Sequence, residues 1–344
     1  MTTELEGLLD RRLIIVSGKG GTGKTAVACA LAVAASQAGL RTLLVETSPI
    51  ESVGGYFEKR PRPLGYAGRK LSPGLHAMRI EPALALAEYV RLQIGLGAVT
   101  DRILDTQTFQ QLLEAAPGWR ELIILGKIWH LEQKQDKRGR PLHDLIIVDA
   151  PATGHGLTFL DVPRVVKSAV HKGPLARHSS WVEELIHDPE RTLLLPVTLP
   201  EELPTLETLE LVSRAREDLD IAVDRIIVNR MPAPVEPQAL DTLQALENSR
   251  SSDSADSQTV RVAFDGLPPL AEMKQILELE SRRAEHALDY RRSVSRQCAL
   301  PIVDLPELAK GFDAQSGWTE IANKLLATPV WPGGETPAEP ANAS

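Results

Sequence analysis

A glycine-rich segment near the N-terminus combines the residue types that bind phosphate. Residues 18–25 read Gly-Lys-Gly-Gly-Thr-Gly-Lys-Thr, which fits the pattern GxxxxGK[ST] and follows an apolar run. Glycines let successive backbone N–H groups turn toward one anion, and the alanine-rich helix expected from about Ala26 points its positive end at the same place. We therefore predict a nucleotide-binding loop formed by Gly18, Gly20, Gly21, Thr22, Gly23, Lys24, Thr25 and Ala26.

Two side chains of this loop are expected to handle ATP or ADP and its metal ion. Lys24 should reach the β- and γ-phosphates, and the hydroxyl of Thr25 should bind Mg²⁺. The apolar run at residues 145–148 ends in Asp149, where a carboxylate would hold the Mg²⁺ shell through water or through Thr25. An aspartate at this place could instead only cap the following helix.

Residues 149–155 are expected to form a loop that senses the γ-phosphate and passes its presence into the next helix. His155, in that loop, is expected to be structural rather than a metal ligand. Asn229 ends a further apolar run and is predicted to recognise adenine, with a turn-forming asparagine as the alternative.

A second lysine, Lys19, follows the first glycine, where an ordinary phosphate-binding loop does not need one. In a face-to-face dimer such a lysine can reach the partner's nucleotide and neutralise charge that develops during phosphoryl transfer. Arginine fingers that act in this way contribute on the order of 10³ to 10⁵ in rate. The alternative is a solvated loop lysine.

Composition restricts the remaining possibilities. The chain has 344 residues, 43% of them apolar and 24% charged, which is ordinary for a soluble globular protein. Its two cysteines, Cys29 and Cys298, lie far apart, so a disulfide framework is not indicated and a reducing, cytoplasmic location is expected. No signal peptide or apolar run of membrane-spanning length is evident. The net charge of −8 disfavours nucleic acid as a partner.

Short apolar runs alternate with helical stretches, which predicts an α/β fold: a mostly parallel sheet flanked by helices. The expected strands are residues 13–16, 42–45, 145–148, 193–197, 226–228 and 301–303. An α-helical subdomain is expected to be inserted, with helices at 84–96, 103–113 and 119–131. Another helix should follow, with Asp161 as its cap, Pro163 in its first turn and Val162, Val165 and Val166 on one face.

The expected domain organisation follows from these elements. Residues 11–82 and 141–328 should form one interrupted ATPase domain, and residues 83–140 with about 155–190 the helical subdomain. Residues 247–258 are polar and without periodicity, which predicts a mobile loop, and the Pro- and Gly-rich residues 329–344 predict a disordered tail.

Four segments together resemble the ArsA family of anion-transporting ATPases. They are the loop KGGTGKT, the segment DAPATGHGLTFL at residues 149–160, the stretch from 197 to 208, and residues 226–229. The family includes the arsenite-pump ATPase and the ATPase that delivers tail-anchored proteins, and this chain is most similar to bacterial members of unassigned role. The resemblance implies a nucleotide-gated dimer, either a homodimer or a heterodimer with a paralogous ATPase, whose helical subdomains bind a client or partner.

The chain departs from the family pattern in its switch loop and in its cysteines. Family members usually carry an aspartate that positions the attacking water where this chain has Ser48. Turnover is then expected to be slow, or Glu46 or Glu51 supplies the carboxylate; the alternative for both glutamates is a solvated loop. We include Glu46 with Lys19, Lys24 and Asp149 as candidate catalytic residues. Neither a zinc clamp nor an arsenite site is expected, because paired and clustered thiolates are missing.

Three functions remain open from the sequence. The first is an ATPase that binds an apolar client or a membrane-associated partner through a helix that is apolar around much of its surface at residues 84–96, although these residues could equally close a helical bundle. The second is a positioning switch like MinD or ParA, and it is weakened by the absence of a basic amphipathic C-terminal helix. The third is a nucleotide-stabilised scaffold with little turnover, for which Ser48 is the support.

Overall fold

An eight-stranded sheet forms the centre of the computed structural model, which describes residues 6–94, 118–169, 172–236, 238–239, 241–243, 245, 269–308 and 321. The strand order is β3-β4-β2-β5-β1-β6-β7-β8, and every neighbouring pair is parallel except β3 with β4. The strands are β1 (Leu13–Gly18), β2 (Thr42–Glu46), β3 (Arg69–Ser72), β4 (Leu75–Arg79), β5 (Leu145–Ala152), β6 (Thr192–Thr198), β7 (Ile226–Met231) and β8 (Ile302–Pro306). The predicted α/β class and all six expected strands are confirmed.

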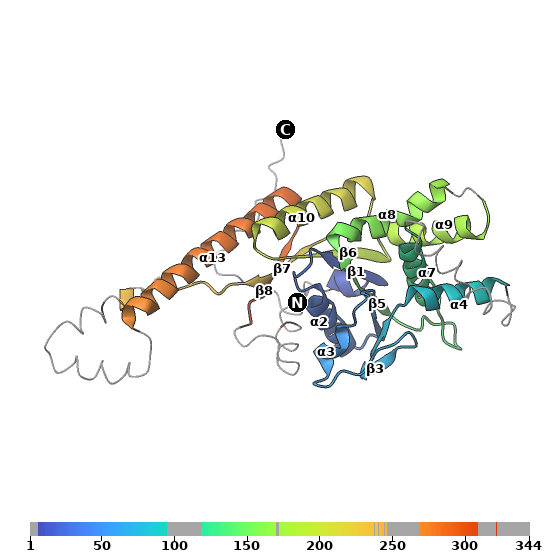
Figure 1. Ribbon diagram of the computed structural model, residues 1–344, viewed down its shortest axis with the longest axis horizontal. Helices are drawn as coiled ribbons and strands as arrows, with labels where there is room; N and C mark the ends of the chain where they lie inside the picture. The colour runs from blue at the N-terminus through green and yellow to red at the C-terminus, as the bar shows by residue number, and fades with distance from the viewer. Residues whose placement is uncertain are drawn as a thin grey trace.

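Helices cover both faces of the sheet, as the continuous apolar runs require (Figure 1). Side chains of β1 alternate between two cores: Leu13 and Ile15 belong to one, Ile14 and Val16 to the other. The second core is closed by α1 (Glu6–Leu9), α2 (Lys24–Gln37) and α3 (Val53–Phe57). Cys29, on α2, is fully buried there.

The hairpin of β3 and β4 was not predicted. β4 pairs in parallel with β2, and β3 pairs antiparallel with β4 at the edge of the sheet. Gly74 supplies the turn between β3 and β4 with a φ of +76°. The dipeptide Pro73-Gly74 was the available signal, because it marks a turn between two runs with strand character.

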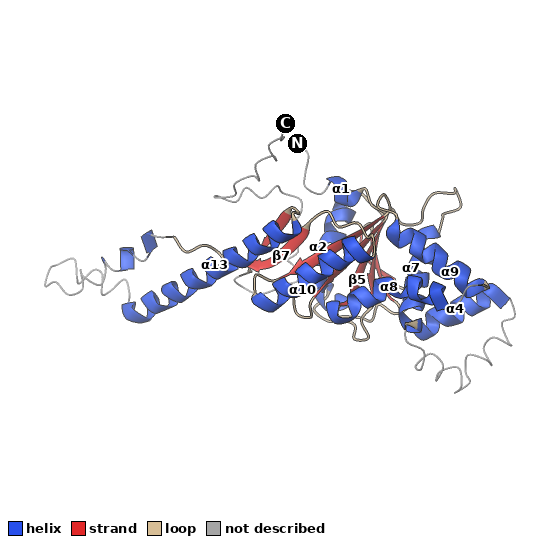
Figure 2. Ribbon diagram, turned by 90° about the horizontal axis from the view of Figure 1, so that it is seen from above, coloured by secondary structure: helices blue, strands red, loops and turns tan. Residues whose placement is uncertain are grey.

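Four helices pack together at one end of the molecule (Figure 2). They are α4 (Pro82–Ile94), α7 (Trp119–Gln133), α8 (Thr153–Ala169) and α9 (Pro174–His187). Two expected helices, at 84–96 and 119–131, correspond to α4 and α7. The helix expected at 103–113, the loop at 247–258 and the tail at 329–344 lie outside the described residues. The division into an ATPase domain and a helical subdomain stays a prediction.

The start of α8 corrects the sequence interpretation. This helix begins at Thr153, so Asp161 and Pro163 lie inside it rather than at its cap and first turn. Asp161 instead pairs with Arg164 one turn later. Of the expected apolar face, Val162 and Val166 are buried, but Val165 is 55% exposed. The strand β5 continues through Ala152, so residues 149–155 contain no loop.

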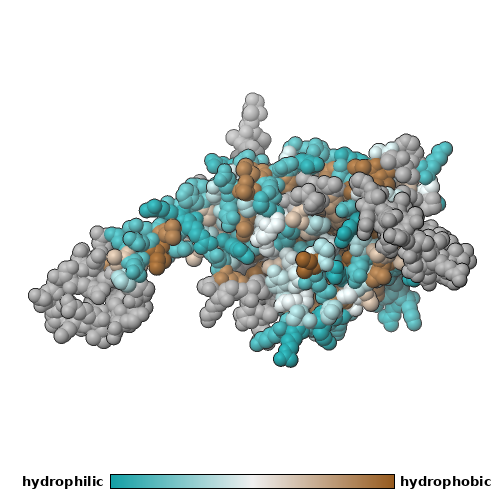
Figure 3. All heavy atoms as spheres, viewed as in Figure 1, coloured by the Kyte–Doolittle hydropathy of each residue, from teal (hydrophilic) through white to brown (hydrophobic). Residues whose placement is uncertain are grey.

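Two further helices lie beside each other along the same face (Figure 1). They are α10 (Glu202–Ser213), followed by the π-helical turn η1 (Arg214–Asp218), and the 29-residue α13 (Leu270–Cys298). The N-terminal half of α13 extends beyond the sheet (Figure 1), and Figure 3 shows some apolar surface on this extension. Ile276 and Leu279, in this half of the helix, are exposed. None of the described helices has both the length and the apolar character needed to cross a bilayer.

Candidate functional site

The phosphate-binding loop joins the central strand β1 to α2, and two of its glycines are required by close neighbours. Gly23 has a φ of +87°, and a Cβ there would lie 2.4 Å from Nδ2 of Asn229. Gly18 has a φ of +151°, and a Cβ there would lie 2.1 Å from the carbonyl oxygen of Val197. A side chain at Gly18 would clash with the backbone of β6, and one at Gly23 would displace the Asn229 side chain, which explains glycine at both positions.

Lys24 is the first residue of α2 and folds over the loop. Its ammonium donates to the carbonyl of Lys19 at 3.0 Å, and the Thr22 hydroxyl donates to the same carbonyl at 2.9 Å. Only 9% of Lys24 is exposed, and burial lowers the pKa of its ammonium while Asp149 opposes that shift. The lysine is thus a largely desolvated cation at the positive end of a helix, which suits it to an anionic ligand.

Asp149 and Thr25 meet across the sheet edge, as the sequence predicts. The Thr25 hydroxyl donates to Oδ2 of Asp149 at 2.6 Å, whereas Oδ1 is buried without a hydrogen-bond partner among the described residues. Burial, assisted by the nearby carboxylate of Glu46, raises the pKa of Asp149 to about 6. A desolvated carboxylate with a free oxygen beside a hydroxyl is a donor set that fits Mg²⁺, so Thr25 and Asp149 are the residues that would hold this ion.

Glu46 lies next to Asp149, because β2 and β5 pair these two residues in register. It is fully buried, and its Oε1 accepts hydrogen bonds from the Ser52 amide at 2.5 Å, the Ser52 hydroxyl at 2.8 Å and the Val53 amide at 3.3 Å. Oε2 has no partner within the described part of the chain, and burial raises the pKa of this carboxyl. One oxygen therefore anchors the loop before α3, and the other remains free for the site.

The loop after β2 is also tied to the strand that carries Asp149. The Thr47 hydroxyl donates to the Asp149 carbonyl at 2.7 Å, and the Ser48 hydroxyl accepts from the Ile50 amide at 3.2 Å. Glu51 accepts from the Leu64 amide at 2.7 Å, which makes it a loop-stabilising residue in this structure. Of the two glutamates considered, Glu46 is the one whose register places it beside Asp149.

Lys19 is paired with Glu207, which lies on α10. The side chains are 29% and 37% exposed, so water partly screens the ion pair. The sequence placed Glu207 in a segment typical of the family but assigned it no role, since nothing in the spacing shows which residue of a distant helix meets the loop.

Asn229 contacts the loop directly. Its Nδ2 donates to the Thr22 carbonyl at 2.8 Å, and its Oδ1 accepts from the Arg230 amide at 3.0 Å. The side chain thus supports the loop at Gly23, a role that the sequence did not suggest. Adenine recognition by the remaining N–H and lone pair stays a prediction. The side chain of His155 lies outside the described residues.

A mostly parallel sheet with this loop after its central strand defines a P-loop nucleoside triphosphatase. Residues 11–180 match the family model described as anion-transporting ATPase. The ATPase BagA of Mycobacterium tuberculosis is 31% identical over 314 residues, covering 89% of this chain and 90% of the relative. The chain belongs to the ArsA family of anion-transporting ATPases, and this membership supports ATP hydrolysis as its activity.

More distant relatives extend the comparison. A putative arsenical pump-driving ATPase of Halobacterium salinarum is 26% identical over 291 residues, which cover 79% of this chain and 43% of the relative. The ATPase GET3 of Kluyveromyces lactis is 26% identical over 256 residues, which cover 64% of this chain and 72% of the relative.

Proposed function

We propose that this protein is a Mg²⁺-dependent ATPase that works as a dimer and whose nucleotide state switches a client- or partner-binding surface on α4, α7, α8 and α9. The observation that carries the proposal is the continuity of the site with those helices. Asp149, which contacts Thr25, lies on β5, and β5 runs without a loop into α8.

The chain's own residues divide the work of hydrolysis. The loop amides and Lys24 would bind the phosphates of ATP, and Thr25 with Asp149 would hold Mg²⁺, which would neutralise negative charge on the phosphates. Water attacks the γ-phosphorus, and the bond from this phosphorus to the oxygen that bridges the β- and γ-phosphates breaks. The bridging oxygen leaves as part of ADP, and the attacking oxygen becomes part of inorganic phosphate. The unpaired Oε2 of Glu46 is the candidate to orient that water, because Ser48 stands where the family usually has an aspartate.

Dimer closure would bring Lys19 to the partner's nucleotide. The partner is a second copy of this chain or a paralogous ATPase. In the present structure Lys19 contacts Glu207, so closure requires that this ion pair open. The pair is partly exposed and worth about 0.2 to 1 kcal/mol, which the attraction to a triphosphate exceeds.

The client surface is inferred from exposed apolar side chains on the helical group. Leu84 and Leu92 on α4, Val165 on α8 and Trp181 on α9 are between 41% and 63% exposed. Such side chains suit an apolar segment of a client or a membrane-associated partner.

Turnover and molecular mass measured together test the proposal. Wild type should dimerise with ATP and Mg²⁺ and hydrolyse ATP. Lys24→Ala should lose ATP binding, and Lys19→Ala should still dimerise but turn over about 10³-fold more slowly. Normal turnover in Lys19→Ala would remove that lysine from the mechanism.

A nucleotide-stabilised scaffold is the second candidate, favoured by Ser48. Wild type would then bind ATP and assemble, alone or with a paralogue, without measurable turnover. For either candidate function, the nucleotide-dependent switch is contradicted if the rates of amide hydrogen exchange on α8 are the same with and without ATP.

A further inference from the structure

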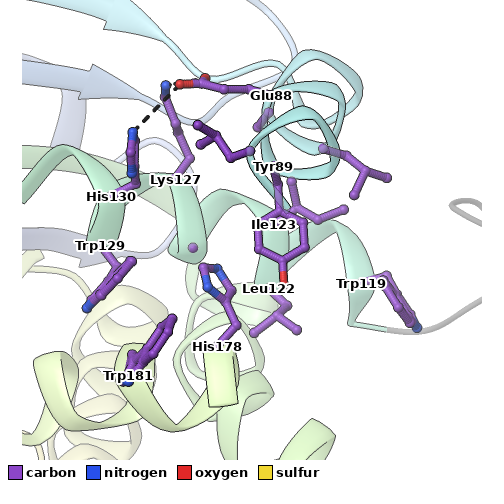
Figure 4. Close-up of a pocket in the computed structure, with 14 residues that line it drawn as sticks. Glu88, Tyr89, Trp119, Leu122, Ile123, Lys127, Trp129, His130, His178 and Trp181 are labelled. Carbon is purple, nitrogen blue, oxygen red and sulfur yellow. Dashed lines mark hydrogen bonds and ion pairs between the residues drawn. The ribbon is translucent and has the colours of Figure 1, made fainter. Parts of the chain in front are cut away.

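A cavity of about 100 Å³ lies among α4, α7 and α9, and no residue of the phosphate-binding loop is part of its described lining (Figure 4). Its walls include Tyr89 from α4, Leu122 and Ile123 from α7, and His178 from α9. Apart from the ion pair of Glu88 with Lys127 at its edge, the described walls are mainly aliphatic and aromatic. A mainly apolar space of this kind favours small ligands that are themselves mainly apolar.

Aromatic rings form one side of the cavity. Trp129 and Trp181 are stacked, with ring centroids 5.0 Å apart and an interplanar angle of 10°. The imidazole of His178 lies 4.8 Å from the Tyr89 ring and 5.6 Å from the Trp129 ring, centroid to centroid. In Figure 4 these rings surround the imidazole from two sides. Such walls favour a planar guest, because ring pairs gain from offset or edge-to-face contact beyond simple burial.

His178 adds a polar group that lacks a partner. Its side chain belongs to a residue only 9% exposed, and burial lowers the pKa of the imidazole, which keeps the ring neutral at pH 7. No hydrogen bond to either ring nitrogen is present in the part of the chain that the structure describes, and neither nitrogen is among its fully buried unpaired atoms, so the ring keeps polar surface that a ligand can reach. The ring also fits closely against α7, since a Cβ at Gly126 would lie 2.2 Å from Nε2.

We propose that this cavity binds one single-ring phenol, with the ring against the aromatic side of the cavity and the hydroxyl hydrogen-bonded to His178. The volume sets an upper limit on size: an engineered cavity of about 150 Å³ accepts one benzene, so a partly open cavity of about 100 Å³ holds at most one ring. The neutral imidazole sets the chemistry, because a ligand with one hydroxyl satisfies a nitrogen that a hydrocarbon leaves unpaired.

Thermal unfolding of the nucleotide-free full-length protein with phenol tests the site independently of ATPase activity. For a ligand of this size we expect a Kd on the order of 1 mM. At ten times that concentration the Tm should rise by about 2 to 3 °C. Toluene has nearly the same shape without the hydroxyl and should bind about five-fold more weakly than phenol after allowance for its solubility.

Three variants locate the binding. Ile123→Phe fills the cavity from α7 and should abolish the shift, and Ala85→Leu does so from α4 if the first variant does not fold. Leu279→Phe adds the same ring size at a position 65% exposed on α13 and should behave as wild type. His178→Leu should remove the preference for phenol over toluene. The proposal is overturned if phenol does not raise the Tm of wild type, as would happen if another part of the chain occupied the cavity. It is also overturned if phenol raises the Tm of Ile123→Phe or Ala85→Leu as much as that of wild type.

Discussion

Replacing Glu207 with glutamine should release Lys19 from α10 and make it more available for the partner's nucleotide. The change keeps the size of the side chain and removes its charge. A partly exposed ion pair is worth about 0.2 to 1 kcal/mol, and here the side chains are 29% and 37% exposed. Since 1.4 kcal/mol corresponds to a factor of ten, the ratio of free to paired Lys19 should rise by about 1.4- to 5-fold. ATP turnover per dimer should rise by at most the same factor if Lys19 limits the rate.

Steady-state phosphate release at low ionic strength measures this effect. The difference between Glu207→Gln and wild type should shrink as salt rises to about 0.5 M, because screening weakens the wild-type ion pair. Glu210→Gln is the matched control, since it removes the same charge from the same helix at a residue that pairs with Arg214. It should leave turnover close to that of wild type.

The double variant of Lys19 and Glu207 decides the reasoning. In a Lys19→Ala background, Glu207→Gln should have no effect, because the group that it releases is missing. A rise in rate that persists in that background would show that Glu207 acts through another contact. A fall in rate in the otherwise wild-type chain would show that the ion pair supports the active conformation and does not oppose it.

Three further predictions concern stability. Gly23→Ala should lower the free energy of unfolding, measured with denaturant, by about 3 kcal/mol or more, because it combines a left-handed φ with a clash against Asn229. The control Gly39→Ala has a φ of +91° and open space around it, so it should lower the free energy of unfolding by only about 1 to 2 kcal/mol. Equal losses in the two variants would contradict the clash. Asp149→Asn should stabilise the nucleotide-free protein by about 1 to 3 kcal/mol at pH 8, because the native carboxylate is buried and is ionised above its pKa of about 6. The same variant should weaken Mg²⁺-dependent ATP binding. If it is less stable than wild type at pH 8, the buried charge of Asp149 does not destabilise the protein. Burial lowers the pKa of His143 to about 4, so the stability that its neutral form contributes is present above pH 6.5 and is lost as the pH falls toward 4. After allowance for partial exposure, the free energy of unfolding should fall by about 1 to 2 kcal/mol over this range. If the His143→Gln variant has the same pH profile of unfolding as wild type, His143 is not the cause of this loss.

The sequence predicted those features that depend on local patterns. The apolar runs identified six strands because strands covered on both faces need continuous apolar residues, and the loop glycines and Thr25 could be read from their spacing. The meeting of Thr25 with Asp149 was also accessible, since both follow strands that end at one sheet edge.

Contacts between distant segments could not be read in this way. Glu207 meets Lys19 through the packing of α10 against β1 and β6, and Asn229 meets Thr22 because β7 lies next to β6, one strand away from β1. The start of α8 was misjudged because Pro163 suggested a first turn, whereas packing tolerates this proline inside the helix. The edge hairpin was missed because its strands are short and only partly apolar.

Because β5 passes directly into α8, a small change in the angle between them would displace the far end of α8 by a larger amount. A 17-residue helix is about 25 Å long. A tilt of about 5° at Thr153 would therefore displace the far end of α8 by about 2 Å, by simple trigonometry on that length. Because α8 packs against α9, an adjustment of less than 1 Å around Asp149 would be magnified at the helical group if α8 moves as one unit across Pro163.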